Sequence, residues 1–319
     1  MCYSAQVWAD YRRYLRDFGA ELDIKAFYEL YWRRIDEPKL KIPKAMDASF
    51  AEPETEAEQR IKAAIDTFAA GESAKLEQMV FEQRKRRVDA ERTLATKPTK
   101  AAANSQRIAT DKIAWAMGKL SDLKRIEVKD SDSRIFPGHY APVMVMENGR
   151  RVVKPMRYQC RPAGKPAFHD TRFPGTYNAR RDNLEGFWKD LFGYSHGIAV
   201  VNAFFENVNQ HRAEGRALGD GEDVKNLILE FRPRPTQSML VACLWSRWSG
   251  PGEPDLLSFA AITDEPPPEV SAAGHDRCII PIKPEHIDAW LNPDPTNLAM
   301  QYAILDDRAR PYYEHRLAA

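Results

Sequence analysis

The spacing of hydrophobic and polar positions changes along the chain. Across residues 5–35, apolar and aromatic residues recur at helix-like spacing and stop before Pro38. Asp23 directly before Ile24 is a typical helix N-cap. Residues 51–125 are rich in Ala, Glu, Lys, Arg and Gln, with apolar residues three and four positions apart. This second pattern predicts amphipathic helices.

From about residue 133 the pattern becomes that of β-strands. Apolar runs flank the segment 147–150, whose Asn148-Gly149 pair is typical of a tight hairpin turn. Further strands are expected over residues 198–206, 240–245, 257–263 and 278–282, followed by a short closing helix over 284–291. Because few helical segments separate these strands, a mainly antiparallel sheet is favoured over parallel βαβ units.

Composition and charge narrow the class of protein. Hydrophobic residues make up 43% of the 319 residues, which is enough for a packed core. The net charge of +1 excludes a protein that coats nucleic acid over its whole surface, although a local basic groove remains open. Residues 52–58 hold four glutamates, whereas residues 81–125 carry a net charge of +7. The run Arg84 to Arg87 is either a solvated helix face or part of an arm that binds nucleic acid or a partner.

Several functional classes lack support in the sequence. No apolar run reaches 18 residues, so we expect no membrane span. The first residues have neither a basic segment nor an apolar one, so we expect no secretory signal and a cytoplasmic location. Cys2, Cys160, Cys243 and Cys278 show no C-x-x-C spacing, and the histidines show no paired-ligand pattern. We therefore expect no disulfide framework, no metal site and no cofactor.

Cys2 is the most informative single residue. If Met1 is removed, the chain begins with an α-amine and a thiol on neighbouring carbons. The α-amine has a pKa of roughly 7.7–8.0 and the thiol one of about 8.5, so both groups are partly nucleophilic near neutral pH. An aldehyde can form a Schiff base with the amine, after which the thiol closes a five-membered thiazolidine. A cysteine at position 2 can equally be accidental.

Three further residues are candidates for chemistry. Asn178 follows a Pro-Gly turn, where an ordinary turn residue is the common alternative. Glu206 ends an apolar strand beside Phe205, and a carboxylate there can act as a general acid or can be a surface charge. His275 lies between Gly274 and Asp276, where it can shuttle protons or have no function.

Taken together, these residues resemble one family, the SRAP (SOS-response-associated peptidase) proteins, which crosslink covalently to abasic sites in DNA. The resemblance covers about residues 1–10 and 133–292. The matching segments occur in the family's order, and they are Met1-Cys2, Val153–Tyr158, Asn178-Ala179-Arg180, Phe205-Glu206, Phe259–Thr263, His275-Asp276-Arg277 and Pro284–Leu291.

The resemblance implies a role for each matching residue. Cys2 would be the crosslinking nucleophile, and Asn178 would hold the reacting group near the amine. Glu206 would act as acid and base during opening of the sugar ring, and His275 would shuttle protons. The implied DNA-binding residues are Arg180 and Arg277, which would bind backbone phosphates, together with Arg157 and Thr263.

The chain departs from the family pattern at three places. Tyr3-Ser4 follows Met-Cys where the family usually has Gly-Arg, so an expected arginine contact is missing. Asn207 replaces a tryptophan after Glu206, and the segment 158–160 reads Tyr-Gln-Cys where Trp-Gly-Leu is usual. These changes keep the chemical residues but alter the DNA-facing surface.

We therefore expect a single SRAP-like α+β domain over residues 1–319, built on a curved, mainly antiparallel sheet or open barrel. The core would comprise about residues 1–22 and 131–292, with a helical insertion over 40–130 and a C-terminal extension over 293–319. The expected partner is single-stranded DNA that contains abasic sites, because a flipped-out base costs least without a duplex.

Beyond this single-stranded partner, we expect no membrane association, a nucleoid-associated location and a possible second partner for the insertion. Two alternatives stay open. One is a thiol peptidase or amidase whose N-terminal cysteine is the nucleophile. The other is a DNA-binding or scaffolding module that forms no covalent bond.

Overall fold

The computed structural model describes residues 3–318, which form two compact units. The core unit contains the described residues of segments 1–27, 40–49 and 129–319. The helical unit contains residues 28–39 and 50–128. Cys2 lies outside the described residues.

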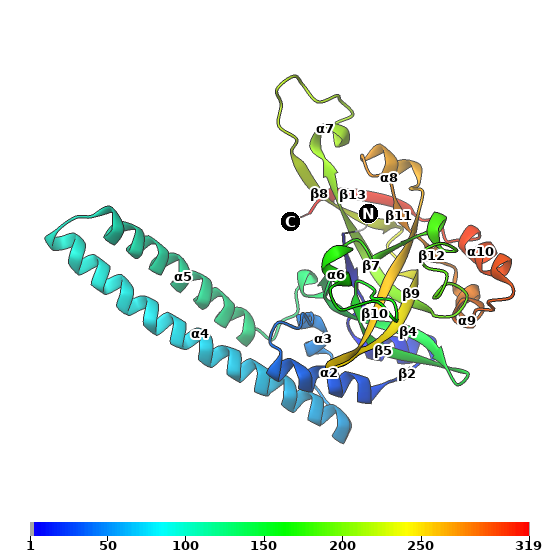
Figure 1. The fold of residues 1–319 in the computed structure, drawn as a ribbon, viewed down its shortest axis with the longest axis horizontal. Helices are drawn as coiled ribbons and strands as arrows, with labels where there is room; N and C mark the ends of the chain where they lie inside the picture. The colour runs from blue at the N-terminus through cyan, green and yellow to red at the C-terminus, as the bar shows by residue number, and fades with distance from the viewer. Residues whose placement is uncertain (1–2, 319) are drawn as a thin grey trace. The chain divides into compact units, whose positions relative to one another are not determined.

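A 13-stranded sheet forms most of the core unit (Figure 1). Its strands are β1 Ser4–Val7, β2 Glu21–Leu22, β3 Arg134–Ile135, β4 Tyr140–Glu147, β5 Arg150–Tyr158, β6 Asn178–Arg180, β7 His196–Asn209, β8 Asn226–Arg234, β9 Met239–Gly250, β10 Glu253–Asp264, β11 Cys278–Ile279, β12 Pro281–Ile282 and β13 Tyr312–Leu317. Its helices are α1 Tyr11–Phe18, α3 Lys44–Ala48, α6 His169–Arg172, α7 Gln210–Ala213, α8 Pro268–Ala272, α9 Ile287–Leu291 and α10 Leu298–Asp306, with short 3-10 turns at η1 Asp130–Ser133, η2 Arg181–Asn183 and η3 Pro284–His286.

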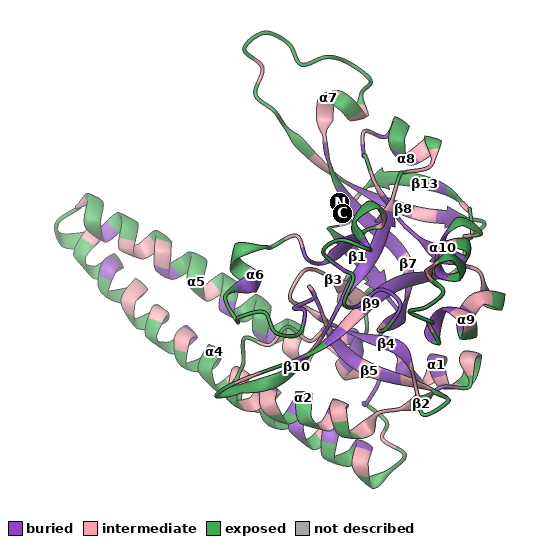
Figure 2. Ribbon diagram, turned by 45° about the vertical axis from the view of Figure 1, so that its right-hand side comes forward, coloured by how far each residue is buried: buried purple, intermediate pink, exposed green. Residues whose placement is uncertain are grey.

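Strands β7, β9, β10, β5 and β4 pair in sequence around an irregular ring. The pairings of β10 with β5 and β6 and of β2 with β5 are parallel, and the others are antiparallel. Purple strands in Figure 2 mark the buried residues of this ring, whose interior is apolar. The expected α+β fold with a mainly antiparallel, curved sheet is thus confirmed.

Local sequence signals account for individual elements. Asn148 and Gly149 have φ values of 50° and 75°, the conformation of a two-residue turn that joins β4 to β5 at the pair Glu147–Arg150. Asp23 accepts a hydrogen bond from the backbone N–H of Ala26 (3.0 Å) and caps α2 (Ile24–Asp36), as expected. One prediction was wrong: Glu206 lies inside β7, which continues to Asn209, and not at the end of a strand.

Two long helices, α4 (Glu56–Thr96) and α5 (Lys100–Lys124), form an antiparallel hairpin in the helical unit. Thr55 and Glu58 make a capping box at the start of α4. The two helices bury a narrow apolar seam, which consists of Leu76, Val80, Ala116 and Leu120 with Met79 and Leu123 at its edge. Figure 2 shows that most of the remaining surface of both helices is exposed.

A buried histidine anchors the start of β7. His196 accepts a hydrogen bond from the N–H of Gly193 (2.9 Å) and contacts the carbonyl of Trp290 in α9 (3.1 Å). The indole of Trp290 donates to the carbonyl of Gly197 (2.9 Å). Because burial removes solvent from the imidazole, the pKa of His196 is lowered to about 3.

This lowered pKa predicts a loss of stability in acid. In the unfolded chain a histidine binds a proton below about pH 6.5, whereas folded His196 stays neutral down to about pH 3. The free energy of unfolding should therefore fall as the pH drops from about 6.5 towards 3. We expect His196→Gln to be less stable at pH 7 but to lose less stability in this interval, measured as the melting temperature against pH. His315→Gln, at an exposed position, is the control, and parallel curves for His196→Gln and wild type would contradict the prediction.

Candidate functional site

A buried carboxylate and a buried imidazole meet in the core unit. Glu206 is fully buried on β7, and its Oε2 lies 3.2 Å from Nε2 of His275. His275 is 8% exposed and belongs to the loop between α8 and β11. This loop passes close to α7, since a Cβ added to Gly274 would lie 3.1 Å from the Cβ of Arg212. Gly274 also has a φ of 92°, which favours glycine.

The position of the hydrogen on the His275 ring decides how this residue faces Glu206. Nδ1 of His275 lies 2.9 Å from the carbonyl oxygen of Arg277, and a carbonyl can only accept, so Nδ1 carries hydrogen. Burial lowers the pKa of His275, which favours the neutral ring near pH 7. Nε2 of the neutral ring is then an acceptor that faces the carboxyl group of Glu206. The pair can therefore give and take one proton in a site with little solvent, which is what general acid–base catalysis needs.

The first described residues lie beside this pair. Strand β1 pairs with β7, with Ser4 opposite Phe205, and the N–H of Tyr3 donates to the carbonyl of Phe205 (3.3 Å). Tyr3 follows Cys2 in sequence, and its hydrogen bond places it beside the segment of β7 that carries Glu206. Of Cys2 itself, the predicted nucleophile, nothing can be added, since it falls outside the described residues.

Two further predicted residues are buried polar groups on adjacent strands. Asn178 begins β6 and is 6% exposed, and Thr263 on β10 is fully buried. In the part of the chain that the structure describes, neither the Asn178 amide nor the Thr263 hydroxyl has a hydrogen-bond partner. Native proteins rarely leave such groups unpaired, because each costs free energy unless a ligand or water completes it. Both side chains are therefore candidates for binding a ligand.

The strand order connects these groups to the histidine loop. Strand β10 lies between β6 and β11, with Thr263 opposite Arg180 on one side and Ile279 on the other. The chain reaches β11 directly from His275. The pairings β6–β10–β11 thus connect the strands of Asn178 and Thr263 to β11, which follows the loop of His275. The contact between His275 and Glu206 connects this loop to β7.

Of the two predicted phosphate-binding arginines, Arg180 pairs directly with Asp182, and Arg277 acts on this carboxylate through its charge alone. Arg180 is exposed and forms a two-point ion pair with Asp182 (3.0 and 2.5 Å). Its hydrogen bonds lower the pKa of Asp182, and the charge of Arg277 acts in the same direction. An exposed ion pair of this kind contributes little stability, so Arg180 can exchange Asp182 for a phosphate at small cost.

Arg157, also predicted to bind DNA, is engaged inside the protein. Its guanidinium lies 2.8 Å from Asp170, which also binds Arg161 (2.5 Å). Burial raises the pKa of Asp170, but the hydrogen bonds and charges of the two arginines outweigh it, and the net pKa is lowered. Arg157 also donates to the carbonyl of Gln159 (3.1 Å). These contacts give the guanidinium of Arg157 partners within the protein, and its role in DNA binding stays a prediction.

Sequence reasoning missed Arg134 on β3. Its Nε donates to the hydroxyl of Ser4 (3.0 Å), and its guanidinium lies 3.7 Å from the ring centre of Phe205. Burial lowers the pKa of Arg134, and among the described residues its Nη2 has no hydrogen-bond partner. A positive charge thus lies beside Ser4, where the expected arginine is absent. Only the pairing of β1 with β3 reveals this arrangement, because about 130 residues separate the two strands.

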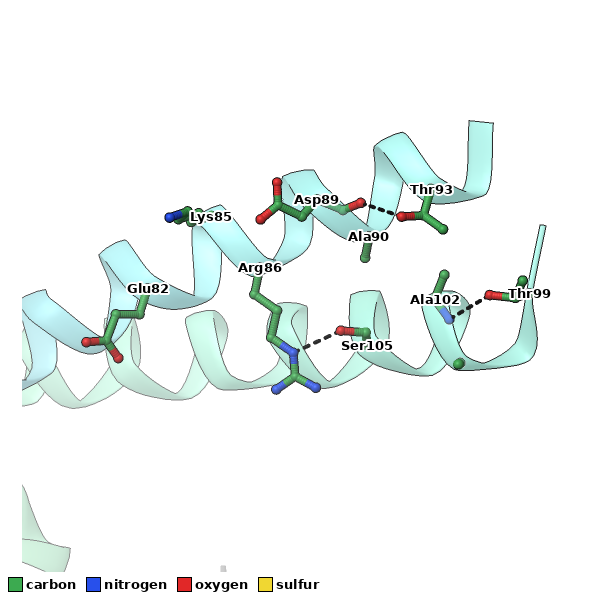
Figure 3. Close-up of a pocket in the computed structure, with 10 residues that line it drawn as sticks. Glu82, Lys85, Arg86, Asp89, Ala90, Thr93, Thr99, Ala102 and Ser105 are labelled. Carbon is green, nitrogen blue, oxygen red and sulfur yellow. Dashed lines mark hydrogen bonds between the residues drawn. The ribbon is translucent and has the colours of Figure 1, made fainter. Parts of the chain in front are cut away.

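Two hollows lie apart from the acid–base pair. One of about 640 Å³ lies on the hairpin, where Figure 3 shows Arg86 reaching from α4 to Ser105 of α5 (2.9 Å). Its lining mixes Lys85 and Arg86 with Glu82 and Asp89. A second hollow of about 620 Å³ lies in the core unit along residues 264–269 and 306–313. Neither lining contains the residues of the acid–base pair, so the chemistry is located by its side chains and not by cavity size.

Other kinds of site find no support within the described residues. There, no group of three or more His, Cys, Asp or Glu side chains is arranged to hold a metal ion. Cys160, Cys243 and Cys278 are buried free thiols, and burial raises the pKa of each. Over residues 3–318, no helix is both long enough and apolar enough to cross a membrane.

Fold and site together define an α+β protein whose mostly antiparallel sheet carries a buried Glu–His pair. Residues 94–317, more than half of the chain, match the family described as SOS response associated peptidase (SRAP). The chain belongs to this family, which the description links to the SOS response to DNA damage and to a peptidase activity. A comparison with curated proteins finds no match.

Three of the solved structures that this chain is similar to come from two bacteria. A protein from Bordetella bronchiseptica is 16% identical, covers 60% of this chain and 89% of its own, and has a TM-score of 0.46. One from Bacteroides thetaiotaomicron is 13% identical, covers 58% and 77%, and has a TM-score of 0.46. A phage-related protein from Bordetella bronchiseptica is 17% identical, covers 58% and 80%, and has a TM-score of 0.42.

The unpaired hydroxyl of Thr263 predicts that the free protein is more stable without it. Thr263→Val keeps the shape of the side chain and removes a buried unpaired polar group, which should raise the free energy of unfolding by about 1 kcal/mol. Thr176→Val is the matched control, because the buried Thr176 hydroxyl donates to the carbonyl of Phe173 (3.2 Å). That control should lose about 1 kcal/mol in the same urea titration. The reverse order would show that the Thr263 hydroxyl has a structural partner.

Proposed function

We propose that this protein captures abasic sites in single-stranded DNA through a covalent thiazolidine at Cys2, after removal of Met1. One observation carries the proposal: the N–H of Tyr3, the residue after Cys2 in sequence, donates to the carbonyl of Phe205, the neighbour of Glu206 in the buried pair. Membership of a family associated with the DNA-damage response agrees with it.

The reaction balances without a cofactor. The ring-closed abasic sugar opens to an aldehyde when one proton leaves its hydroxyl and another reaches the ring oxygen. The α-amine of Cys2 adds to the aldehyde carbon, and water leaves as the Schiff base forms. The thiol of Cys2 then adds across the C=N bond, its sulfur bonding to carbon and its proton passing to nitrogen. A five-membered ring results, and the net loss is one water.

Each site residue has a role in this sequence. Protonated Glu206 is the acid that supplies a proton to the departing oxygen, and its carboxylate is the base that removes one. His275 exchanges that proton with Glu206 across 3.2 Å. The unpaired amide of Asn178 would hold the sugar or the amine, and the unpaired hydroxyl of Thr263 would bind the strand.

The strand itself would be held by charge. Arg180, which is exposed and paired with Asp182, and Arg277 would bind phosphates on either side of the lesion. Arg134 would add a third positive charge beside Ser4. Such contacts position a strand without reading its sequence, which suits a protein that must accept a lesion in any context.

The decisive test uses denaturing electrophoresis after incubation with an abasic oligonucleotide. The mature protein should give a stable adduct, and Cys2→Ala should give none. A variant with a non-removable N-terminal tag should also fail, because it keeps the thiol but lacks the free α-amine. An adduct with the tagged protein would refute the thiazolidine. Hydrolysis of a peptide substrate without any adduct would instead support the peptidase that the family description names.

Glu206→Gln is predicted to slow adduct formation by about 10²–10⁴-fold, because it removes a proton-transfer group. Affinity for an undamaged strand should stay near the wild-type value, since Glu206 is fully buried. Glu230→Gln is a control carboxylate, buried on β8 and paired with Arg316 (2.8 Å). Its adduct rate should be close to wild type. A wild-type rate for Glu206→Gln would remove Glu206 from the mechanism.

A further inference from the structure

The hairpin of the helical unit carries a set of unpaired positive charges. Between residues 81 and 125 the net charge is +7, although α4 begins among glutamates. Five cations there, Arg87, Arg92, Arg107, Lys124 and Arg125, pair with carboxylates of the hairpin. Six others are exposed and, among the described residues, have no ion-pair partner: Arg84, Lys85, Lys97, Lys100, Lys112 and Lys119.

An exposed tryptophan lies within this set. Trp115 is 54% exposed and has no ring contact with any described residue. It stands three residues after Lys112 and four before Lys119, a spacing that places all three side chains on one helix face. The seam with α4 uses Ala109, Ala116 and Leu120 instead, so Trp115 is not needed for packing within the hairpin. We name Lys112, Trp115 and Lys119 the α5 strip.

We propose that the α5 strip binds single-stranded DNA, as a second contact remote in sequence from the capture site. The inference rests on the proposed function, in that the ligand is the class of nucleic acid that the capture site is proposed to take. Lys112 and Lys119 would bind backbone phosphates, and a base would stack on the indole of Trp115 between them. The two lysines are separated by about 10 Å along the helix axis, which matches about three nucleotides of a strand.

Charge decides between the two occupants that such a strip could take. A second copy of this chain would bring another basic hairpin face against the α5 strip, and like charges repel across an interface. A nucleic acid is complementary to unpaired lysines and releases counterions when it binds them. An unpaired base leaves its face free for the indole, which favours a single strand over a duplex.

The test measures binding of a fluorescent oligothymidine without an abasic site to the full chain. Lys112→Gln with Lys119→Gln should weaken binding about 10- to 30-fold at 0.1 M salt and make the log–log salt dependence shallower by about 1.4. Trp115→Ala should weaken binding about 5- to 100-fold and leave the salt dependence unchanged. Circular dichroism should show wild-type helicity for both variants, because all three residues are exposed.

A charge-matched control lies on the same hairpin. Lys62→Gln with Lys75→Gln removes the same charge, but these lysines pair with Asp66 (2.6 Å) and Glu72 (2.7 Å) in the acidic half. This control should bind the oligonucleotide like wild type. Equal effects in both lysine pairs, or none in either, would overturn the proposal.

Two further outcomes would also overturn it. Tighter binding of duplex than of single strand would exclude the stacking role of Trp115. Sedimentation that shows a dimer, lost in Trp115→Ala, would assign the α5 strip to a second copy. Cys2→Ala separates the two proposals, because it should form no adduct. If substitution of the α5 strip in this variant still weakens oligonucleotide binding, the strip is supported independently of the capture chemistry.

Discussion

The arrangement of this protein depends on keeping Glu206 inside the sheet. A carboxyl group that is fully buried is costly unless other groups interact with it, and the imidazole of His275 lies 3.2 Å from it. The surrounding structure holds both groups in place. Strand β7 pairs with β1, β4, β8 and β9, so Glu206 cannot withdraw to solvent without breaking several ladders. At the other end of β7, buried His196 and Trp290 fix where the strand begins.

Two buried polar groups without partners lie on β6 and on β10, and β10 pairs with β11, the strand that follows the loop of His275. Asn178 and Thr263 lower the stability of the free protein, since their side chains have given up water without a replacement among the described residues. Such unpaired groups are found at sites where a bound ligand supplies the missing hydrogen bonds. In contrast, Arg157 and Arg161 share Asp170, and Glu230 binds Arg316, so these charges are satisfied internally. Burial alone therefore does not distinguish Asn178 and Thr263 from these charged residues. The presence of hydrogen-bond partners does.

The two units use charge in different ways. In the core unit, arginines are held in specific geometry by carboxylates or aromatic rings, as Arg180 is by Asp182 and Arg134 by Phe205. In the hairpin, six cations point into solvent on helices that are stabilised by capping and a thin apolar seam. The first arrangement suits orientation of a reacting group, and the second suits non-specific attraction of a polyanion.

Much of this protein follows from local sequence. The Asn148-Gly149 turn, the Asp23 cap, the long helices and the major strands are encoded by residues close together in the chain, so periodicity and turn chemistry predict them. The motif residues could also be named from their order. Long-range pairing decided the rest. Residues 4–7 form a strand because β7 and β3 accept them, and β13 joins β8 from the far end of the chain. Whether Arg157 is free, whether Glu206 ends its strand and which arginine stands beside Ser4 depend on neighbours up to 130 residues away. Periodicity carries no information about such neighbours, because it records which face a residue occupies and not what the fold brings against it.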